Sequence, residues 1–273
     1  MIRGYVWGTP PIERDPRLVP VVVIHHNAPG LSAADAVERA FRRTGGVPAG
    51  PFAIAAQPPQ GGRPPHTYTT AFGDKERGGL YDAAGANHKA CGKLHDWLEE
   101  AFGIVAAAVG YRPPECALLD WEGFYGAGPD FRSRSSVQRW AGVRARVMQD
   151  TVVAAAERAW GVPIDASNYE DRPHSHADLA PDGKTYATTG IGSTSAPVFY
   201  AGARGLGLQQ VKADAAKAIA TSKAAGVVCR PWINEPELAE WVARFGVDEV
   251  VAWGSGAASS GPLQEWILRQ GRK

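Results

Sequence analysis

The chain has 273 residues, of which 44% are hydrophobic and 21% are charged, so it can bury a full core and fits one large domain or two small ones. Its formal net charge is +1, and lysine and arginine form no dense cluster with interleaved aromatic residues, which argues against nucleic acid or an acidic membrane as a partner. The three cysteines are far apart and odd in number, which argues against a disulfide framework and against C-x-x-C metal spacing.

The start of the sequence, Met1–Gly8, lacks the apolar segment and cleavage site of a secretory signal peptide. No apolar run approaches the roughly 18 residues of a membrane span. We therefore expect a chain without a membrane segment, either cytoplasmic or released by a route other than Sec, for example with a phage.

A strand and a helix open the predicted alternation. Val19–Ile24 is a β-branched run that predicts a buried strand, and His25–Asn27 form its polar tip. Ser32 and Asp35 have capping-box spacing at the start of a helix, which Gly45 ends. These segments make one βα unit.

A second unit follows, with an unusual connection. Phe52–Ala56 predicts a strand, and residues 57–85 form a loop rich in proline and glycine that is far longer than ordinary βα loops. A helix with apolar residues at three- and four-residue spacing then runs to about Ala108 and leads into the short apolar run Ala117–Leu119.

The second half of the chain repeats this alternation, with another long polar loop at residues 170–195. Further strands are predicted at Val162–Tyr169, Pro197–Tyr200, Val227–Ile233 and Glu249–Trp253. Further helices are predicted at Ser135–Trp160, Leu208–Ile219, Leu238–Phe245 and Leu263–Leu268. Pro231 weakens one of these strands or marks a bulge, and Asn234 has capping-box-like spacing to Glu237 before the helix that follows.

Strands that alternate with helices predict a parallel sheet. Seven strands and a possible eighth are predicted, and no glycine-rich phosphate loop follows the first strand. The prediction is therefore a (β/α)8-type (TIM-like) barrel, distorted or seven-stranded, in a single domain over residues 1–273. The long loops at about 57–85 and 170–195 belong to its active face, because barrel active sites lie at the carboxyl ends of the strands.

The most distinctive motif follows the run Ala117–Leu119, where Asp120 and Glu122 flank Trp121. Side chains two apart on a strand leave the same face, with Cα atoms roughly 6.6 Å apart. Repulsion between the two carboxylates, together with their burial, then raises the pKa of one of them. That acid stays protonated and can donate a proton beside its ionised partner, as in glycosidases. The alternative is structural, with Asp120 capping the next loop and Glu122 paired with an arginine such as Arg132 or Arg134.

Aromatic and amide side chains follow several other predicted strands. Sugar rings stack on aromatic faces, and their hydroxyls bind polar groups. The sequence therefore predicts an acidic, aromatic cleft that binds an oligosaccharide or polysaccharide. Its binding residues are Asn27, Trp121, Asn168, Tyr169, Tyr200, Trp232 and Trp253.

The Asp120-Trp121-Glu122 strand end resembles the hyaluronidase family of glycoside hydrolases, which have a distorted barrel. Further similarities follow in chain order: Tyr5–Trp7 with Pro10, Gly78–Leu80, Asn168–Asp171, Val198–Tyr200 and Val250–Ser255. The resemblance implies that Glu122 is the proton donor and that the N-acetyl group of the substrate is the nucleophile. It also implies that Asp120 holds this group.

By the same resemblance, Tyr200 and Tyr169 contact the acetamido group or the sugar, and Trp253 lies under the reactive ring. The chain departs from the family in lacking counterparts of its barrel disulfides and a strongly basic groove, and in being shorter. The chitinase pattern D-x-x-D-x-D-x-E is matched only in its second half, at Asp120 and Glu122. Lysozyme-like barrels that attack cell-wall glycan are a third similar group.

Two other classes of function remain open. One is a metal-dependent hydrolase that uses His25, His26, His174 and His176, because an H-x-H pair can present two imidazoles to one ion. The other is a non-catalytic barrel that binds glycan or serves as a structural part of an assembly. The favoured glycosidase needs neither a metal nor a cofactor.

Overall fold

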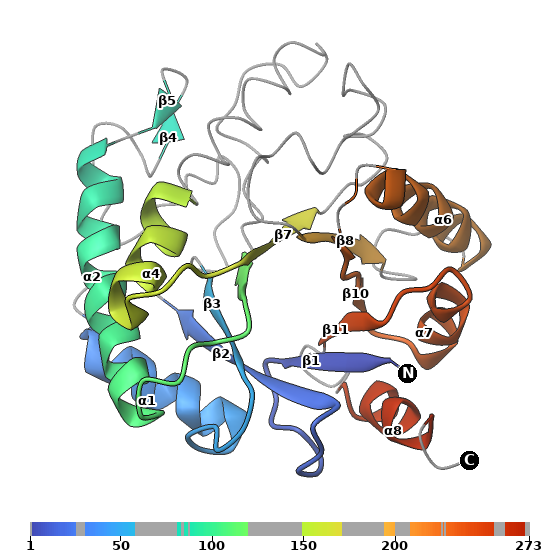
Figure 1. The fold of residues 1–273 in the computed structure, drawn as a ribbon, viewed down its shortest axis with the longest axis horizontal. Coiled ribbons are helices and arrows are strands. Elements are labelled where there is room, and N and C mark those ends of the chain that lie inside the picture. Colours follow the sequence, from blue (N-terminus) through green and yellow to red (C-terminus); the bar gives the residue numbers. More distant parts are fainter. Residues whose placement is uncertain are drawn as a thin grey trace.

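The computed structural model describes residues 2–25, 31–57, 81–82, 85–86, 88–119, 149–170, 194–199, 208–224, 226, 228–253 and 260–270. Within these residues the protein is an α/β structure, built on a curled parallel sheet with helices on its outer side (Figure 1). This confirms the predicted α/β class and parallel sheet.

The sheet contains nine of the described strands, in the order β10-β11-β1-β2-β3-β6-β7-β8-β9, and every neighbouring pair is parallel. β10 also pairs in parallel with β8, so the sheet curls back on itself and is compatible with a distorted barrel. The strands are β1 (Arg3–Trp7), β2 (Leu18–His25), β3 (Ala53–Gln57), β6 (Ala117–Leu119), β7 (Ala166–Glu170), β8 (Thr194–Phe199), β9 (Val228–Cys229), β10 (Trp232–Ile233) and β11 (Glu249–Trp253).

The helices form two groups outside the sheet, with α1, α2 and α4 beside β2 and β3 and with α6, α7 and α8 beside β10, β11 and β1 (Figure 1). No described helix is long and apolar enough to cross a membrane. A small antiparallel hairpin of β4 (Tyr81–Asp82) and β5 (Gly85–Ala86) precedes α2. The helices are α1 (Ala33–Thr44), α2 (His88–Ala108), a π-helical turn (Gln149–Val153) that continues into α4 (Ala154–Trp160), α6 (Leu208–Ala224), α7 (Pro236–Ala243) and α8 (Gly261–Arg269).

Strands β1, β2, β3, β6 and β11 contribute buried side chains to both faces of the sheet. On β2, Val22 and Ile24 belong to an apolar cluster with α1, α2 and α4, whereas Val21 and Val23 belong to a separate interior cluster. A third cluster joins the other end of the sheet to α6, α7 and α8. Because successive side chains on a strand alternate between faces, the interior cluster lies on the concave side of the sheet, away from the helices.

The connection from β1 to β2, residues 8–17, contains no helix. A hydrogen bond from Ile12 N to Gln264 Oε1 (2.9 Å) holds it to α8, and a hydrogen bond between the Thr9 and Ser260 hydroxyls (3.0 Å) holds it to the N-cap residue of that helix. A loop therefore lies where a regular βα repeat would have its first helix.

Most predicted elements occur, with corrections at their ends. Ser32 caps α1 by accepting a hydrogen bond from Asp35 N, and Gly45 ends it in the left-handed conformation. The strand predicted from Val162 begins at Ala166, because Pro163 cannot donate to a strand ladder. Residues 135–148 of the helix predicted at 135–160 lie outside the described residues.

Two predictions around Pro231 need correction. The strand predicted over Val227–Ile233 is divided into β9 and β10, since Pro231 has no N–H to donate. The predicted cap of the next helix is also wrong: Glu235 is the N-cap residue of α7, and Pro236 is in its first turn. This leaves the side chain of Asn234 free of a capping role.

Candidate functional site

The carboxyl ends of the parallel strands form one edge of the sheet, which we call the carboxyl edge. β1 ends at Trp7 and β11 at Trp253, and these two residues are register partners. β2 ends at His25. β6, whose three residues are all buried, ends at Leu119, directly before Asp120. These strand ends therefore mark the edge at which barrel enzymes have their active sites.

Of the predicted site residues, Trp232 and Trp253 have described side chains. Asn168 and Tyr169 lie in β7, and Asn168 is the register partner of Leu119, so it is next to the residue that precedes Asp120. The remaining predicted residues lie outside the described residues: Asn27, Asp120, Trp121, Glu122 and Tyr200.

Three tryptophans, Trp7, Trp232 and Trp253, make up what we call the tryptophan group. The rings of Trp7 and Trp232 have centroids 4.6 Å apart and planes inclined at 56°. Trp232 is 1% exposed, and its register partner on β11 is Val251, two residues before Trp253. Trp253 is only partly buried and packs against the interior cluster. Trp232 is therefore a packing residue beneath the edge, and Trp253 is the member available to a ligand.

Trp7 is a member of this group that the sequence analysis did not name as a site residue. Its signal in the sequence is an aromatic side chain at the end of an apolar run, directly before a glycine. It is 4% exposed, so its contribution is to support the neighbouring rings.

Asn234 is a second residue that the sequence analysis missed. It follows β10, whose Ile233 pairs with Ala252, so it lies level with Trp253. Its Oδ1 atom is buried and accepts no hydrogen bond from any described residue. An unpaired buried amide oxygen costs about 1–3 kcal/mol, so Asn234 is a further candidate for a ligand contact at the carboxyl edge.

Ser167 gives the interior a further polar group. It is the register partner of Leu118 and is 1% exposed, and its hydroxyl has no hydrogen-bond partner among the described residues. Its neighbour Ala166 belongs to the helix-side cluster, so alternation directs Ser167 to the interior, one residue before Asn168.

His25, at the end of β2, interacts with Arg43 of α1 through its Nε2 atom. A guanidinium group can only donate, so Nε2 is the acceptor and the imidazole is neutral. Burial, together with the nearby Arg43 charge, lowers the pKa of His25 to about 4. His25 is therefore uncharged at neutral pH.

The opposite ends of the same strands are joined by a polar network, which we call the amino-end network: Arg3, Tyr5, Glu115, Cys116, Arg230 and Glu249. Arg230 donates from Nε (2.9 Å) and Nη2 (2.5 Å) to Oε2 of Glu249. Arg3 donates to Oε1 of Glu115 (2.5 Å). The Tyr5 hydroxyl is 3.1 Å from Glu115 and 3.4 Å from Glu249, so this tyrosine links the two ion pairs.

Burial keeps the uncharged members of this network neutral. It raises the pKa of the Cys116 thiol to about 12 and also raises that of the Tyr5 hydroxyl. Arg230 donates to the Cys116 sulfur over 3.3 Å and lies over the Tyr5 ring, 4.5 Å from its centroid. A protonated, buried thiol is a poor nucleophile, so the amino-end network is a structural feature and contains no reactive cysteine.

Among the described residues, no group of three or more histidine, cysteine, aspartate or glutamate side chains is arranged to hold a metal ion. The metal-site alternative relied on His26, His174 and His176, which lie outside the described residues. In His25, the fourth residue of that set, Nε2 already accepts a hydrogen bond from Arg43.

Comparison of the sequence with models of protein families found no match, and comparison with curated proteins found no significant relative.

Proposed function

We propose that the protein is a glycoside hydrolase that cleaves a glycan containing N-acetylhexosamine, and that its sheet is a distorted (β/α)8-type barrel. Asp120 and Glu122 carry the reaction at the carboxyl edge. The natural glycan is an oligosaccharide or polysaccharide, and the reaction requires no cofactor.

The observation that carries this proposal is the orientation of β6. Leu118 belongs to the interior cluster, whereas Ala117 and Leu119 belong to the helix-side cluster. If the alternation of the strand continues, positions 120 and 122 share the face of Leu118. Both acids then point into the interior, above Leu118, where a substrate enters at the carboxyl edge.

The strand order supports a cleft between the acids and the tryptophan group. From β6 to β11 the pairings pass through β3, β2 and β1 in one direction and through β7, β8 and β10 in the other. Three strands separate them on either side, so a glycan that crosses the mouth of the barrel would meet Asp120 and Glu122 on one wall and Trp253 on the opposite wall.

The proposed mechanism follows from two acids on one face of one strand. Glu122 donates a proton to the leaving glycosidic oxygen. Asp120 approaches the sugar from the same side, which is unsuitable for direct attack on the anomeric carbon, so it holds and polarises the acetamido group of the substrate. The acetamido oxygen attacks the anomeric carbon, and water later opens the cyclic intermediate. By resemblance, Tyr169 and Tyr200 contact this group.

The test is an assay of new reducing ends on oligosaccharides from chitin, hyaluronan and peptidoglycan. The parent protein should cleave at least one of them. Glu122→Gln should lower turnover by about 10²- to 10⁴-fold, because the amide cannot donate the proton. Glu240→Gln, at an exposed position of α7, is the matched control and should retain parental turnover.

The same assay, together with a binding titration of the same oligosaccharides, distinguishes the alternatives. Turnover that is lost with a chelator would indicate a metal-dependent hydrolase. Saturable binding of a glycan without turnover would indicate a binding barrel. Parental turnover in Glu122→Gln would remove Glu122 from the role of acid.

A further inference from the structure

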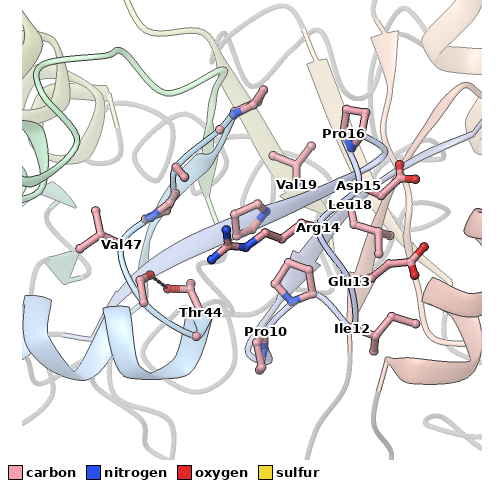
Figure 2. A pocket seen from close by; sticks show the side chains of 18 residues that line it. Pro10, Ile12, Glu13, Arg14, Asp15, Pro16, Leu18, Val19, Thr44 and Val47 are labelled. Carbon is pink, nitrogen blue, oxygen red and sulfur yellow. Dashed lines mark hydrogen bonds between the residues drawn. The ribbon is translucent and has the colours of Figure 1, made fainter.

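A pocket of about 500 Å³ lies between the β1–β2 connection and the segment that joins α1 to β3 (Figure 2). Residues 10–16 form one wall, residues 44–51 form the other, and the first residues of β2 form its base. Both walls lead into the amino ends of β2 and β3. The pocket is therefore outside the sheet and separate from the carboxyl edge.

Both walls are fixed by hydrogen bonds to other elements. Arg112 donates to the carbonyl oxygens of Pro48 (2.6 Å) and Ala49 (3.2 Å). On the opposite wall, Ile12 N donates to Gln264. Thr44 donates to Gly46 O (2.8 Å), within its own wall (Figure 2). The pocket is thus preformed, which is typical of small-molecule sites, and its volume is in their usual range of about 300–1,000 Å³.

The lining is mainly apolar and poor in hydrogen-bond donors. Ile12 and Val47 are 50% and 49% exposed, although both are large apolar side chains. Proline has no N–H group, so the proline positions add apolar surface without donors. The lining prolines are Pro10, Pro11, Pro16, Pro20, Pro48 and Pro51.

Arg14 supplies the positive charge of this pocket. Figure 2 shows its side chain extending toward the wall formed by residues 44–51, whereas the carboxylates of Glu13 and Asp15 point the other way. Asp15 forms an ion pair with Arg17 (2.7 Å). The Arg14 guanidinium has no hydrogen-bond or ion-pair partner among the described residues, so its donors are available to a ligand.

We propose that this pocket binds a small organic carboxylate with an apolar ring body. The carboxylate accepts two hydrogen bonds from the Arg14 guanidinium, a geometry that arginine favours, and the ring packs between the two proline-rich walls, against Val47 and Leu18. The proposal is independent of the glycosidase proposal, since it uses neither the carboxyl edge nor its residues.

Biphenyl-4-carboxylate is a suitable probe, titrated into ¹⁵N-labelled protein and followed in two-dimensional NMR spectra. Saturable shifts are expected for the backbone amides of residues 12–15 and 44–47. Biphenyl-4-carboxamide, which has the same body without the charge, should bind at least about tenfold more weakly.

Arg14→Gln should weaken binding of the carboxylate by about ten- to a hundredfold, with an otherwise unchanged spectrum because Arg14 is exposed. Arg39→Gln, at an exposed position of α1 outside the pocket, is the matched control and should bind as the parent does. Absence of saturable shifts in these two segments, equal affinity for the carboxamide, or undiminished affinity in Arg14→Gln would each overturn the proposal.

Discussion

Trp253 and Trp232 lie on neighbouring strands of the same sheet, but their surroundings differ. Trp253 is the last residue of β11 and is partly buried, whereas Trp232 is 1% exposed and packs against Trp7. Removing a fully buried tryptophan typically costs about 3–5 kcal/mol, and removing a partly exposed ring costs less. The two residues can therefore be separated by experiment into a ligand contact and a packing residue.

Trp253→Ala should weaken binding of a glycan that the parent binds, with a small drop in melting temperature. Trp232→Ala should lower the free energy of unfolding by about 3–5 kcal/mol. Calorimetric titration and thermal unfolding of both variants give the comparison. A large loss of stability in Trp253→Ala, with unchanged affinity, would contradict its role as a platform.

The depressed pKa of His25 predicts a pH dependence of stability. The folded protein binds a proton at His25 only near pH 4, whereas the unfolded chain does so near 6.5. Between these values the unfolded state binds more protons, so stability falls as the pH falls, by up to about 1.4 kcal/mol per pH unit. His25→Gln lacks this titration.

Urea unfolding of the parent and of His25→Gln at pH 7, 6 and 5 tests this point. The carboxylates are common to both proteins, so the difference between the two slopes reports His25. The parent should lose more stability than the variant across this range. Parallel pH profiles would show that His25 has an ordinary pKa in the folded protein.

Packing between elements depends on Gly4 of β1. A Cβ atom at this position would lie 2.5 Å from Cδ1 of Ile267 on α8, closer than real Cβ contacts. Glycine at this position therefore leaves room for the terminal methyl group of Ile267, and the contact offers a test of the β1–α8 interface.

Gly4→Ala should cost about 1–3 kcal/mol, as overpacking does, and Ile267→Val about 0.5–1.5 kcal/mol. Because valine lacks the clashing Cδ1, the double variant should be more stable than the sum of the two costs predicts. Denaturant unfolding of all four proteins measures the coupling. Simple additivity would mean that Gly4 and Ile267 do not restrict each other.

At the level of elements, the sequence predicted those whose signals are local. The β-branched runs of β2 and β11 gave strands with nearly correct ends, and the Ser32 cap and Gly45 fixed both ends of α1. The division of β9 from β10 was harder to predict, because strands of two residues are defined by their pairing with β8 and β11. Asn234 was wrongly predicted to cap α7, because its spacing to Glu237 is that of a capping box, whereas Glu235 is the N-cap residue.

The amino-end network connects strands that are distant in the sheet. Glu115 and Cys116 directly precede β6, Arg230 precedes β10, and Glu249 begins β11. Their contacts through Tyr5 and Arg230 reach from β6 to β1, β10 and β11. This network therefore fixes β6, the strand before the proposed catalytic acids, relative to the strand that ends in Trp253.

Arg230→Met should destabilise the protein substantially, because it leaves Glu249 partly buried with Arg3 as a more distant partner at 3.9 Å. The loss should stay below the about 3–5 kcal/mol of a fully buried pair. Arg244→Met removes an exposed ion pair with Glu240 and should cost no more than about 1 kcal/mol. Equal effects of the two variants in urea unfolding would contradict a bracing role for the network.

For the whole molecule, the alternation of strands and helices was sufficient to predict a parallel sheet with helices outside it. The three prolines of residues 8–17 disfavour a helix there, but nothing local indicates that this connection packs on α8. The pocket beside Arg14 depends on this connection, so it also had no signal in the sequence. The ends of β2 and β11 at the carboxyl edge were more predictable, since His25 directly follows an apolar run and Trp253 ends one.

Proton NMR of the first product distinguishes acetamido-assisted cleavage by Asp120 and Glu122 from the other mechanisms. An oligosaccharide that the parent cleaves is compared with the same oligosaccharide after removal of its N-acetyl groups. Only the N-acetylated substrate should be cleaved, and the first product should retain the anomeric configuration of the substrate. Efficient cleavage of the deacetylated substrate, or an inverted first product, would contradict the mechanism.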